Sequence, residues 1–185
     1  MVVLDDGTAR VDVGRQVHDY ERWLDQSVAE DPLVLVAAHE PGLQMYTSGT
    51  TGRPKGAVFS TAALRANAPM GELLGLHEDA RVLIAMPVFQ AAGSTFAAQA
   101  LMAGGECVVA RDVTVEHLLA LIEERQVTVA PLVPVTLRTL LEFPALDARD
   151  LSSLKAIAYA GSPISEPLLA DVLRCFRCDV SSSTD

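Results

Sequence analysis

The sequence is poor in the residues that mark several large classes of protein. Among 185 residues there are 3 cysteines, an odd number that does not make a disulfide framework. Lys55 and Lys155 are the only lysines and the arginines do not cluster, so the basic surface that nucleic acid requires is lacking. No apolar run approaches the roughly 18–20 residues of a membrane-spanning helix. Asp5 and Asp6 come too early for a secretory signal, and we expect a cytoplasmic protein without a transmembrane segment.

What the chain does contain is typical of a globular protein. Apolar residues make up 50% of the sequence and charged residues 21%, a balance that excludes a disordered chain. The formal net charge of -10 makes the molecule acidic, which further disfavours nucleic acid as a partner. The length suits one domain with a hydrophobic core, or part of a larger domain.

Two of the cysteines, Cys175 and Cys178, form a C-x-x-C pattern that has two interpretations. A metal or redox pair is one of them. Zinc wants four ligands, however, and no second pair accompanies this one. A redox pair normally opens a helix, where the thiolate is stabilised, whereas this pair is expected to close one. The sequence therefore favours two reduced thiols without a shared function.

Apolar patterning predicts strands and helices in alternation along the chain. Strands are expected at residues 33–38, 42–47, 56–60, 81–87, 106–110, 127–132, 154–160 and 178–183. Helices are expected at residues 17–30, 61–74, 91–105, 115–126, 134–143 and 167–175. The first of these strands is equally compatible with a loop, and Thr61 and Thr114 are expected to cap their helices. This alternation indicates an α/β fold with a mostly parallel sheet and helices on both of its faces.

The stretch "MYTSGTTGRPKG", residues 45–56, is unusual because it is glycine-rich, rich in hydroxyl groups and locally basic. Its glycines allow positive φ and a close approach of the backbone to a ligand. Successive N–H groups in such a turn form a concave anion site, and the hydroxyl groups and Lys55 add further donors. These donors suit a polyphosphate. The residues concerned are Thr47, Ser48, Gly49, Thr50, Thr51, Gly52 and Lys55.

This loop is not a Walker-type P-loop, which needs Gly-Lys followed by Ser or Thr and then a helix. Lys55 instead follows Pro54, which pushes Arg53 towards an extended conformation. We therefore expect a strand after the loop, so that the loop joins two strands. A hairpin turn made of common turn residues is the alternative, although such a turn needs only two to five residues.

Residues 46–56, "YTSGTTGRPKG", resemble the phosphate-binding loop of the adenylate-forming superfamily of AMP-dependent synthetases and ligases. This superfamily includes acyl-CoA synthetases, aryl-acid ligases, peptide-synthetase adenylation domains and luciferases. The resemblance implies a reaction in two steps. A carboxylate attacks the α-phosphate of ATP, with Mg²⁺, to give an acyl-adenylate and pyrophosphate. A thiol, commonly that of coenzyme A, then displaces AMP.

By the same resemblance, three downstream segments supply other parts of the site. "MPVFQAAGSTF" (residues 86–96) is similar to a segment that lines the acyl pocket, which implicates Phe89, Gln90 and Gly93. Gln90 stands where the family usually has His, and a polar residue that closes a buried strand is its alternative interpretation. "YAGSPIS" (residues 159–165) is similar to the stretch that packs on adenine. That stretch implicates Gly161, Ser162 and Pro163.

The last segment, "SSSTD", departs furthest from the family pattern of an aromatic residue, Gly, any residue and Thr-Glu. Thr184 matches the Thr that contacts the nucleotide, and we assign it a catalytic role together with Lys55. Asp185 takes the place of a Mg²⁺-binding Glu and is expected to act with Thr47. Ser181 and Ser182 replace the aromatic residue and the Gly, which removes a stacking surface.

The resemblance implies a single partial AMP-binding domain over residues 1–185. Residues 1–15 form a lead-in strand and loop, and residues 16–185 form the nucleotide-binding core. The family's C-terminal lysine domain and the portion that completes the first sheet are expected to be absent. A sheet cut in this way exposes apolar edges. We therefore expect a homo-oligomer, association with the missing portions, or marginal stability.

The function predicted on these grounds is ATP-dependent activation of a carboxylic acid, most like a fatty acid, and its transfer to coenzyme A. The small-molecule partners are then the acid, ATP and coenzyme A. A non-catalytic remnant that binds nucleotide or partner proteins is the main alternative, and one part of a split enzyme is another. The apolar helix after Gly93 fits either a hydrocarbon or aryl pocket or ordinary core packing.

Overall fold

The structure is a computed structural model that describes residues 2–3, 18–47 and 52–182 of the chain. The chain forms two compact units, Met1–Val36 and Ala37–Asp185. The expectation of a single domain over residues 1–185 stays a prediction.

The first unit contains short elements only. Strand β1 (Val2–Val3) pairs in parallel with β2 (His18–Asp19). Helix α1 (Tyr20–Asp25) follows, and the Asp19 side chain caps it by accepting a hydrogen bond of 2.9 Å from the Arg22 N–H. The helix predicted at residues 17–30 is thus present but shorter, because none of its residues is buried and packing does not extend it.

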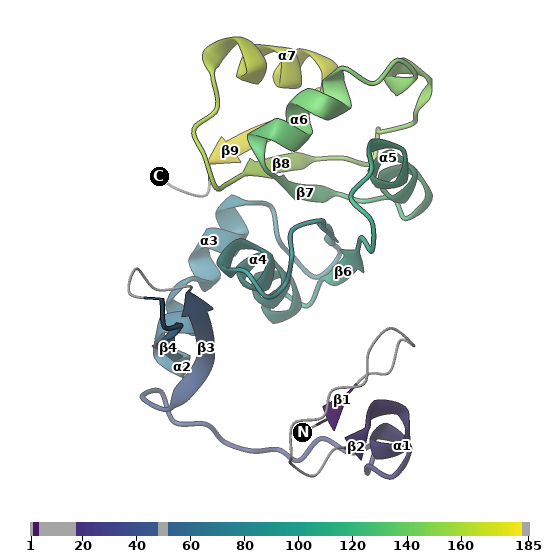
Figure 1. Cartoon of the computed structure of the whole chain (residues 1–185). Coiled ribbons are helices and arrows are strands. Elements are labelled where there is room, and N and C mark those ends of the chain that lie inside the picture. Colours follow the sequence, from purple (N-terminus) through teal and green to yellow (C-terminus); the bar gives the residue numbers. More distant parts are fainter. Residues whose placement is uncertain (1, 4–17, 48–51, 183–185) are drawn as a thin grey trace. The chain divides into compact units, whose positions relative to one another are not determined.

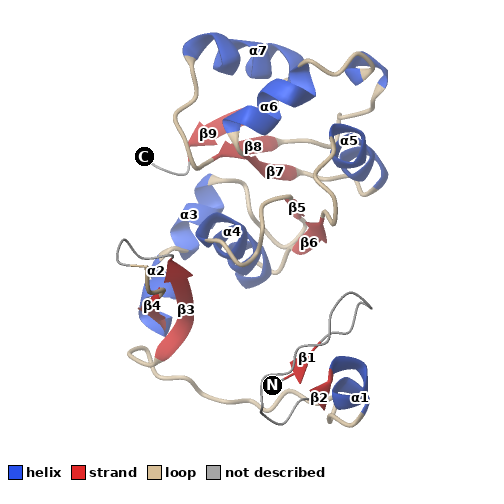
Figure 2. Ribbon diagram, viewed as in Figure 1, coloured by secondary structure: helices blue, strands red, loops and turns tan. Residues whose placement is uncertain are grey.

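A parallel sheet of five strands forms the centre of the second unit (Figure 2). All neighbouring strands in it pair in parallel, in the order β6-β5-β7-β8-β9. The strands are β5 (Arg81–Ile84), β6 (Glu106–Val109), β7 (Val129–Leu132), β8 (Ala156–Tyr159) and β9 (Asp179–Ser182). This sheet confirms the predicted α/β class with a mostly parallel sheet.

Helices cover both faces of the sheet (Figure 1). Helices α5, α6 and α7 pack on one face, around buried residues such as Leu119, Leu137 and Val172. Helices α3 and α4 pack on the other face, around residues such as Phe96 and Ala100. These helices are α3 (Ala68–Leu73), α4 (Ala91–Met102), α5 (Val115–Glu124), α6 (Pro134–Leu141) and α7 (Glu166–Phe176), with a 3₁₀ turn η1 (Leu146–Ala148) after α6.

Strand β5 shows why the predicted run at residues 81–87 is apolar throughout. Val82 and Ile84 point into the core under α3 and α4, whereas Leu83 points into the core under α5, α6 and α7. All three side chains are at most 3% exposed. A strand buried on both faces has no polar positions, which is the pattern of a central parallel strand.

The strand order also locates the place where a ligand is expected. From β5 the chain runs outward to β6 and then returns to β7 on the other side of β5. The connections after β5 and β7 therefore leave the carboxyl ends of these two strands in opposite directions. Doubly wound sheets bind ligands at this switch point.

Ahead of the sheet, β3 (Pro41–Thr47) and β4 (Lys55–Ser60) form an antiparallel hairpin, and α2 (Thr61–Ala66) packs on it. The hairpin confirms that two strands flank the glycine-rich loop. Residues 33–38 are not a strand, so the loop alternative was right for them. The segment has no partner strand, Leu33 has a positive φ of 49°, and Leu35 is 98% exposed.

The helix predicted at residues 61–74 is interrupted, and its cap was wrongly assigned. The cap is Ser60, whose hydroxyl accepts a hydrogen bond of 3.2 Å from the Ala63 N–H. Asn67 is the C-cap of α2 and the N-cap of α3, and Pro69 lies in the first turn of α3. Proline lacks an N–H and clashes with the preceding turn, so a continuous helix through residue 69 is unfavourable.

These caps give a testable contrast. Ser60→Ala removes a hydrogen-bonded cap and is expected to lower the free energy of unfolding by about 1 kcal/mol. Thr114→Ala is the matched control, because Thr114 holds the same position at α5 but its side chain makes no cap hydrogen bond. It should cost less than about half as much. Urea unfolding curves measure both values, and equal losses would show that the Ser60 cap is not what stabilises α2.

Candidate functional site

The hairpin places two of the predicted phosphate-binding residues opposite each other. Thr47 is the last residue of β3 and Lys55 the first residue of β4, and the strand register pairs them directly. Residues paired across antiparallel strands share one face, so the hydroxyl and the ammonium group emerge on the same side of the hairpin. Both side chains are exposed. Between them lie Ser48, Gly49, Thr50 and Thr51, which are outside the described residues.

On the side of the loop that leads to β4, the backbone has the left-handed conformation that glycine favours. Gly52 has a φ of 79°, and a Cβ atom placed on it would meet no atom within 4 Å. A non-glycine residue would be strained here by its backbone conformation and not by crowding.

The two cations of the loop are available to a ligand. Arg53 and Lys55 are both exposed, and neither takes part in an ion pair with another described residue. The ion pairs between described residues lie elsewhere, at Arg81–Glu106, Arg125–Glu106, Arg149–Glu123 and Arg174–Asp171. In a chain with a net charge of -10, two unpaired cations on one hairpin form a local attraction for an anion.

The predicted acyl-pocket residues follow β5, at one side of the switch point. Phe89 is 80% exposed, so its ring is free to contact a ligand. Gln90 is exposed and stands at the start of α4, where its side chain makes no cap hydrogen bond. Its backbone carbonyl accepts from the Ser94 N–H at 3.0 Å. Gln90 therefore opens a helix, and it does not close a buried strand.

Gly93, the third predicted acyl-pocket residue, has a steric role that the sequence did not indicate. It is buried in the first turn of α4. A Cβ atom on Gly93 would lie 2.3 Å from the Pro87 carbonyl oxygen and 2.6 Å from that of Met86. The chain after β5 thus lies directly against this turn of the helix, and only glycine leaves room for it.

The predicted adenine-binding residues follow β8 at the same edge of the sheet. Gly161 has a φ of 85°, and its Cβ position would lie 3.6 Å from the Val133 Cγ1 atom. Ser162 and Pro163 are exposed. Val133 comes directly after β7 and was missed as a wall of this site. The sequence could have indicated Val133, because it stands between the buried strand β7 and Pro134 at the start of α6.

Strand β9 leads to the last predicted residues. Ser181 and Ser182 are half-buried within it, and Ser182 is paired in register with Tyr159. Thr184 and Asp185, the predicted catalytic and metal-binding residues, lie outside the described residues. Within the described ranges, no group of three or more His, Cys, Asp or Glu side chains could hold a metal ion.

Taken together, the parallel strands bring the chain after β5, β7 and β8 to one edge of the sheet, with exposed apolar, small and backbone groups. The phosphate-binding candidates are carried separately by the β3–β4 hairpin, which is connected through α2 and α3 to α4. This arrangement places the exposed Thr47, Arg53 and Lys55 on the hairpin, and the exposed Gly161, Ser162 and Pro163 at the sheet edge. These site assignments stay predictions.

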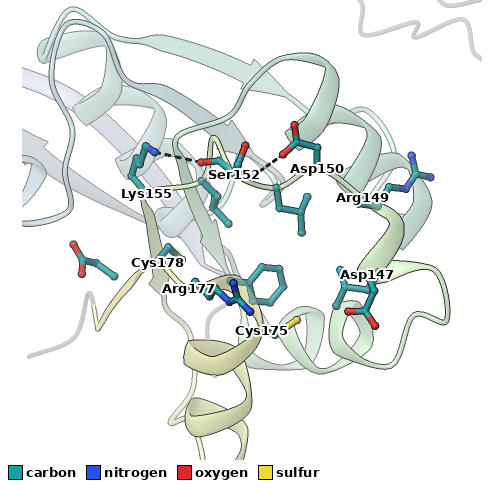
Figure 3. A pocket seen from close by; sticks show the side chains of 13 residues that line it. Asp147, Arg149, Asp150, Ser152, Lys155, Cys175, Arg177 and Cys178 are labelled. Atoms are coloured by element: carbon teal, nitrogen blue, oxygen red, sulfur yellow. Dashed lines mark hydrogen bonds between the residues drawn. The ribbon is translucent and has the colours of Figure 1, made fainter.

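A pocket of about 780 Å³ opens at the opposite, amino edge of the sheet (Figure 3). Lys155, before β8, donates from Nζ to the Ser152 carbonyl at 3.2 Å, and the Ser152 N–H donates to Asp150 Oδ1 at 3.0 Å. Hydrogen bonds from Ser152 lower the pKa of Asp150. The lining mixes three cations with three carboxylates and favours no single sign of ligand. The cations are Arg149, Lys155 and Arg177, and the carboxylates are Asp147, Asp150 and Asp179.

The C-x-x-C cysteines line this amino-edge pocket as free thiols. Cys175 lies in the last turn of α7, and Cys178 follows the left-handed Arg177 that ends the helix. Burial, with Asp179 next to it, raises the pKa of Cys178 to about 11, and burial also raises the pKa of Cys175. Both thiols are therefore protonated near neutral pH, which fits the interpretation of two reduced, unreactive cysteines.

A search of the described helices found none with the length and apolar character needed to cross a membrane.

A doubly wound parallel sheet with glycine-bearing loops at its carboxyl edge defines an α/β protein of the nucleotide-binding type. The family model for "AMP-binding enzyme" matches residues 2–183, and the chain belongs to this family. Its curated relatives are acid ligases, in agreement with the resemblance of the loop motif. The chain spans about a third of the length of the curated relatives compared below.

Two relatives illustrate the range of the family. A fatty acid–[acyl-carrier-protein] ligase, ScoC, from Streptomyces coeruleorubidus is 37% identical over 149 residues, which is 78% of this chain and 29% of that protein. An indoleacetate–CoA ligase from Aromatoleum aromaticum is 36% identical over 162 residues, 84% of this chain and 31% of that protein. The N-terminal domain of FACL13 from Mycobacterium tuberculosis has the same fold, with a TM-score of 0.80 at 23% identity. That match covers 90% of this chain and 42% of the N-terminal domain chain of FACL13.

Two helical glycines test the close contact at Gly93. Gly93→Ala forces a methyl group against backbone carbonyls and should lower the free energy of unfolding by about 2 kcal/mol. Gly71→Ala, in α3, is the control. A Cβ atom on Gly71 would lie 3.5 Å from Leu76 Cδ1, which is an ordinary van der Waals distance. That substitution should be neutral or raise the free energy of unfolding by up to about 1 kcal/mol. Chemical denaturation that gives the same sign for both would contradict the packing described here.

The raised pKa of Cys178 predicts slow alkylation of the folded chain. The rate of its reaction with iodoacetamide should keep rising with pH up to about 11, beyond the usual thiol range near 9. Burial of the neutral thiol also stabilises the fold below about pH 9, and this contribution is lost as the pH rises towards 11. Mass spectrometry of a Cys175→Ala variant isolates the Cys178 rate from that of its neighbour. A rate that levels off near pH 8 or 9 would show that the thiol is not buried as described.

Proposed function

We propose that the chain carries the nucleotide-binding part of an ATP-dependent ligase. The proposed reaction activates a carboxylic acid, most like a fatty acid, through an acyl-adenylate and then transfers the acyl group to coenzyme A. The observation that carries this proposal is the direct pairing of Thr47 with Lys55 across the hairpin. This pairing brackets the loop with the adenylate-forming motif, in a chain of the AMP-binding enzyme family.

In the first step, a carboxylate oxygen of the acid attacks the α-phosphorus of ATP, and the bond from that phosphorus to pyrophosphate breaks. Lys55 and the donors of residues 47–52 hold the β- and γ-phosphates. The negative charge that grows on the leaving pyrophosphate is then met by a cation already in place. Positioning and charge stabilisation of this kind are the main catalytic contributions in transfers at phosphorus.

The adenine ring lies, in this proposal, on the chain after β8. Gly161 and Ser162 offer backbone and small atoms on which a purine can lie flat, and Val133 supports that turn from the neighbouring connection. Thr184, beyond the end of β9, contacts the nucleotide. Because β8 and β9 are neighbours in parallel, their carboxyl ends point to the same side.

Mg²⁺ is expected to accompany ATP, with Thr47 and Asp185 as its proposed ligands. Both offer hard oxygen donors, which Mg²⁺ prefers. Thr47 fits such a role because its side chain is exposed at the end of β3. When bound, the ion supplies positive charge that neutralises phosphate oxygens.

An apolar acid is favoured by the exposed side chains at the carboxyl edge. Phe89 follows β5, and Val135, in the first turn of α6, is 68% exposed. Exposed apolar side chains at a switch point are suited to a hydrocarbon or aryl group. The two relatives described above differ in their acid and in the acceptor of the acyl group, and we propose coenzyme A as the acceptor for this chain.

Nucleotide binding without catalysis is a second candidate, which includes a split enzyme completed by another chain. Ser181 and Ser182 in β9 favour it, because they stand where the family pattern has an aromatic residue and a glycine. They are half-buried, so they offer no stacking surface to a purine.

The two lysines of the chain allow a controlled test of the loop. Lys55→Ala removes the cation held opposite Thr47 and should weaken binding of ATP about tenfold or more, because a charged hydrogen bond is lost. Lys155→Ala removes the other lysine, at the amino edge of the sheet, and should leave the affinity unchanged. Isothermal titration with ATP and Mg²⁺ measures both. If Lys55→Ala binds ATP as well as the wild-type chain does, the loop does not hold the phosphates.

Exchange of labelled pyrophosphate into ATP separates the two candidate functions. Exchange that depends on an added fatty acid supports acid activation by this chain. ATP binding without exchange supports the second candidate, and addition of a separately expressed lysine domain from a related ligase then tests for a split enzyme.

A further inference from the structure

Gln99, in the third turn of α4, is the one polar side chain in the described part of the chain that is almost completely buried. It is 4% exposed, and between α3 and α4 it lines a pocket of about 440 Å³ together with Gly71, Leu76 and Met102. A polar side chain in such a place is costly unless its groups are hydrogen-bonded. Its contacts therefore need an explanation.

Only one half of the Gln99 amide has a partner. Its Nε2 donates to the backbone carbonyl of Asn67 at 3.0 Å, whereas Oε1 is buried with no hydrogen-bond partner among the described residues. A buried acceptor without a partner costs at least as much stability as a typical hydrogen bond contributes. A methionine or leucine would fill the same space without that cost. The polar residue is therefore not explained by stability.

The Asn67 carbonyl, which accepts this hydrogen bond, lies at the connection between α2 and α3. Asn67 is both the C-cap of α2, which ends at Ala66, and the N-cap of α3, which begins at Ala68. Its carbonyl also accepts from the Met70 N–H at 3.1 Å, within the first turn of α3. The Gln99 amide is thus hydrogen-bonded to the residue at which the helix predicted as continuous is interrupted.

Each end of the bond is connected to one half of the proposed site. Helix α2 follows β4 without an intervening residue and packs on both strands of the hairpin that carries Thr47 and Lys55. Helix α4 begins after Phe89 and is pressed at Gly93 against the chain that leaves β5. The hydrogen bond joins residues 32 positions apart in the sequence.

We propose that Gln99 is a positioning residue that fixes the phosphate-loop hairpin relative to the acid-binding end of α4. It couples the two ligands, so that ATP bound at the hairpin favours binding of the acid at the sheet edge. In some proteins a buried polar group specifies one arrangement of the chain at the expense of stability. The inference rests on the function proposed above.

The test compares Gln99→Met with a control in the full chain. Methionine has a similar volume and cannot donate a hydrogen bond, so the free energy of unfolding should stay unchanged or rise. Met102→Leu is the control, because it changes packing on the same helix without touching the hydrogen bond. A bond that served stability alone would make Gln99→Met less stable than the wild-type chain, and this result would overturn the proposal.

Hydrogen–deuterium exchange of the unliganded chain reports on positioning directly. In Gln99→Met, the amides of residues 61–74 should exchange at least about tenfold faster, because the connection between α2 and α3 at Asn67 loses the hydrogen bond from Gln99. Those of the five-stranded sheet should not change, and Met102→Leu should match the wild-type chain throughout. Unchanged exchange in residues 61–74 of Gln99→Met would overturn the proposal, whether or not the chain binds ATP.

Ligand coupling is measured with octanoate and a non-hydrolysable ATP analogue. In the wild-type chain the analogue should tighten octanoate binding by about fivefold or more. In Gln99→Met this ratio should fall towards one, while the affinity for the analogue alone changes less than about twofold. A wild-type ratio of one, or a ratio that Gln99→Met preserves, contradicts the coupling. A wild-type chain that binds neither ligand contradicts the proposed function instead, and hydrogen exchange then decides the role of Gln99.

Discussion

The pairing of β5 with both β6 and β7 is the constraint on which the rest of the second unit depends. All three strands are parallel, so each connection crosses over the sheet and every carboxyl end points to the same edge. Because the chain runs first to one side of β5 and then to the other, right-handed crossovers place α4 and α5 on opposite faces. Two separate cores, the burial of β5 on both faces and the reversal of strand order at the switch point all follow.

The fold was largely readable from the sequence, because buried parallel strands leave a strong signal. The apolar run at residues 81–87 and the helix at 115–126 correspond to β5 and α5. The errors came from features that single patterns do not encode. Pro69 interrupts the predicted helix at residues 61–74, and residues 33–38 have strand-forming side chains but no partner to pair with. Strand propensity alone does not supply that partner.

The candidate site was likewise predictable from the sequence only in part. The glycine-rich loop could be found because a phosphate site needs recognisable residues at fixed spacing, and the hairpin register then paired Thr47 with Lys55. The steric demand at Gly93 and the contact of the Gly161 turn with Val133 depend on distances between connections far apart in the chain. The same holds for Gln99, whose sequence context is an ordinary apolar helix. Such contacts follow from tertiary packing, which no local pattern records.

In the proposed function, ATP spans the hairpin loop and the carboxyl edge of the sheet. Chemical-shift mapping of the ¹⁵N-labelled chain during titration with ATP and Mg²⁺ tests it most directly. The account predicts shifts at residues 47–55 and 160–163, with the amino-edge pocket at 149–155 unaffected. Shifts confined to that pocket, or the absence of shifts at saturating ATP, would contradict it.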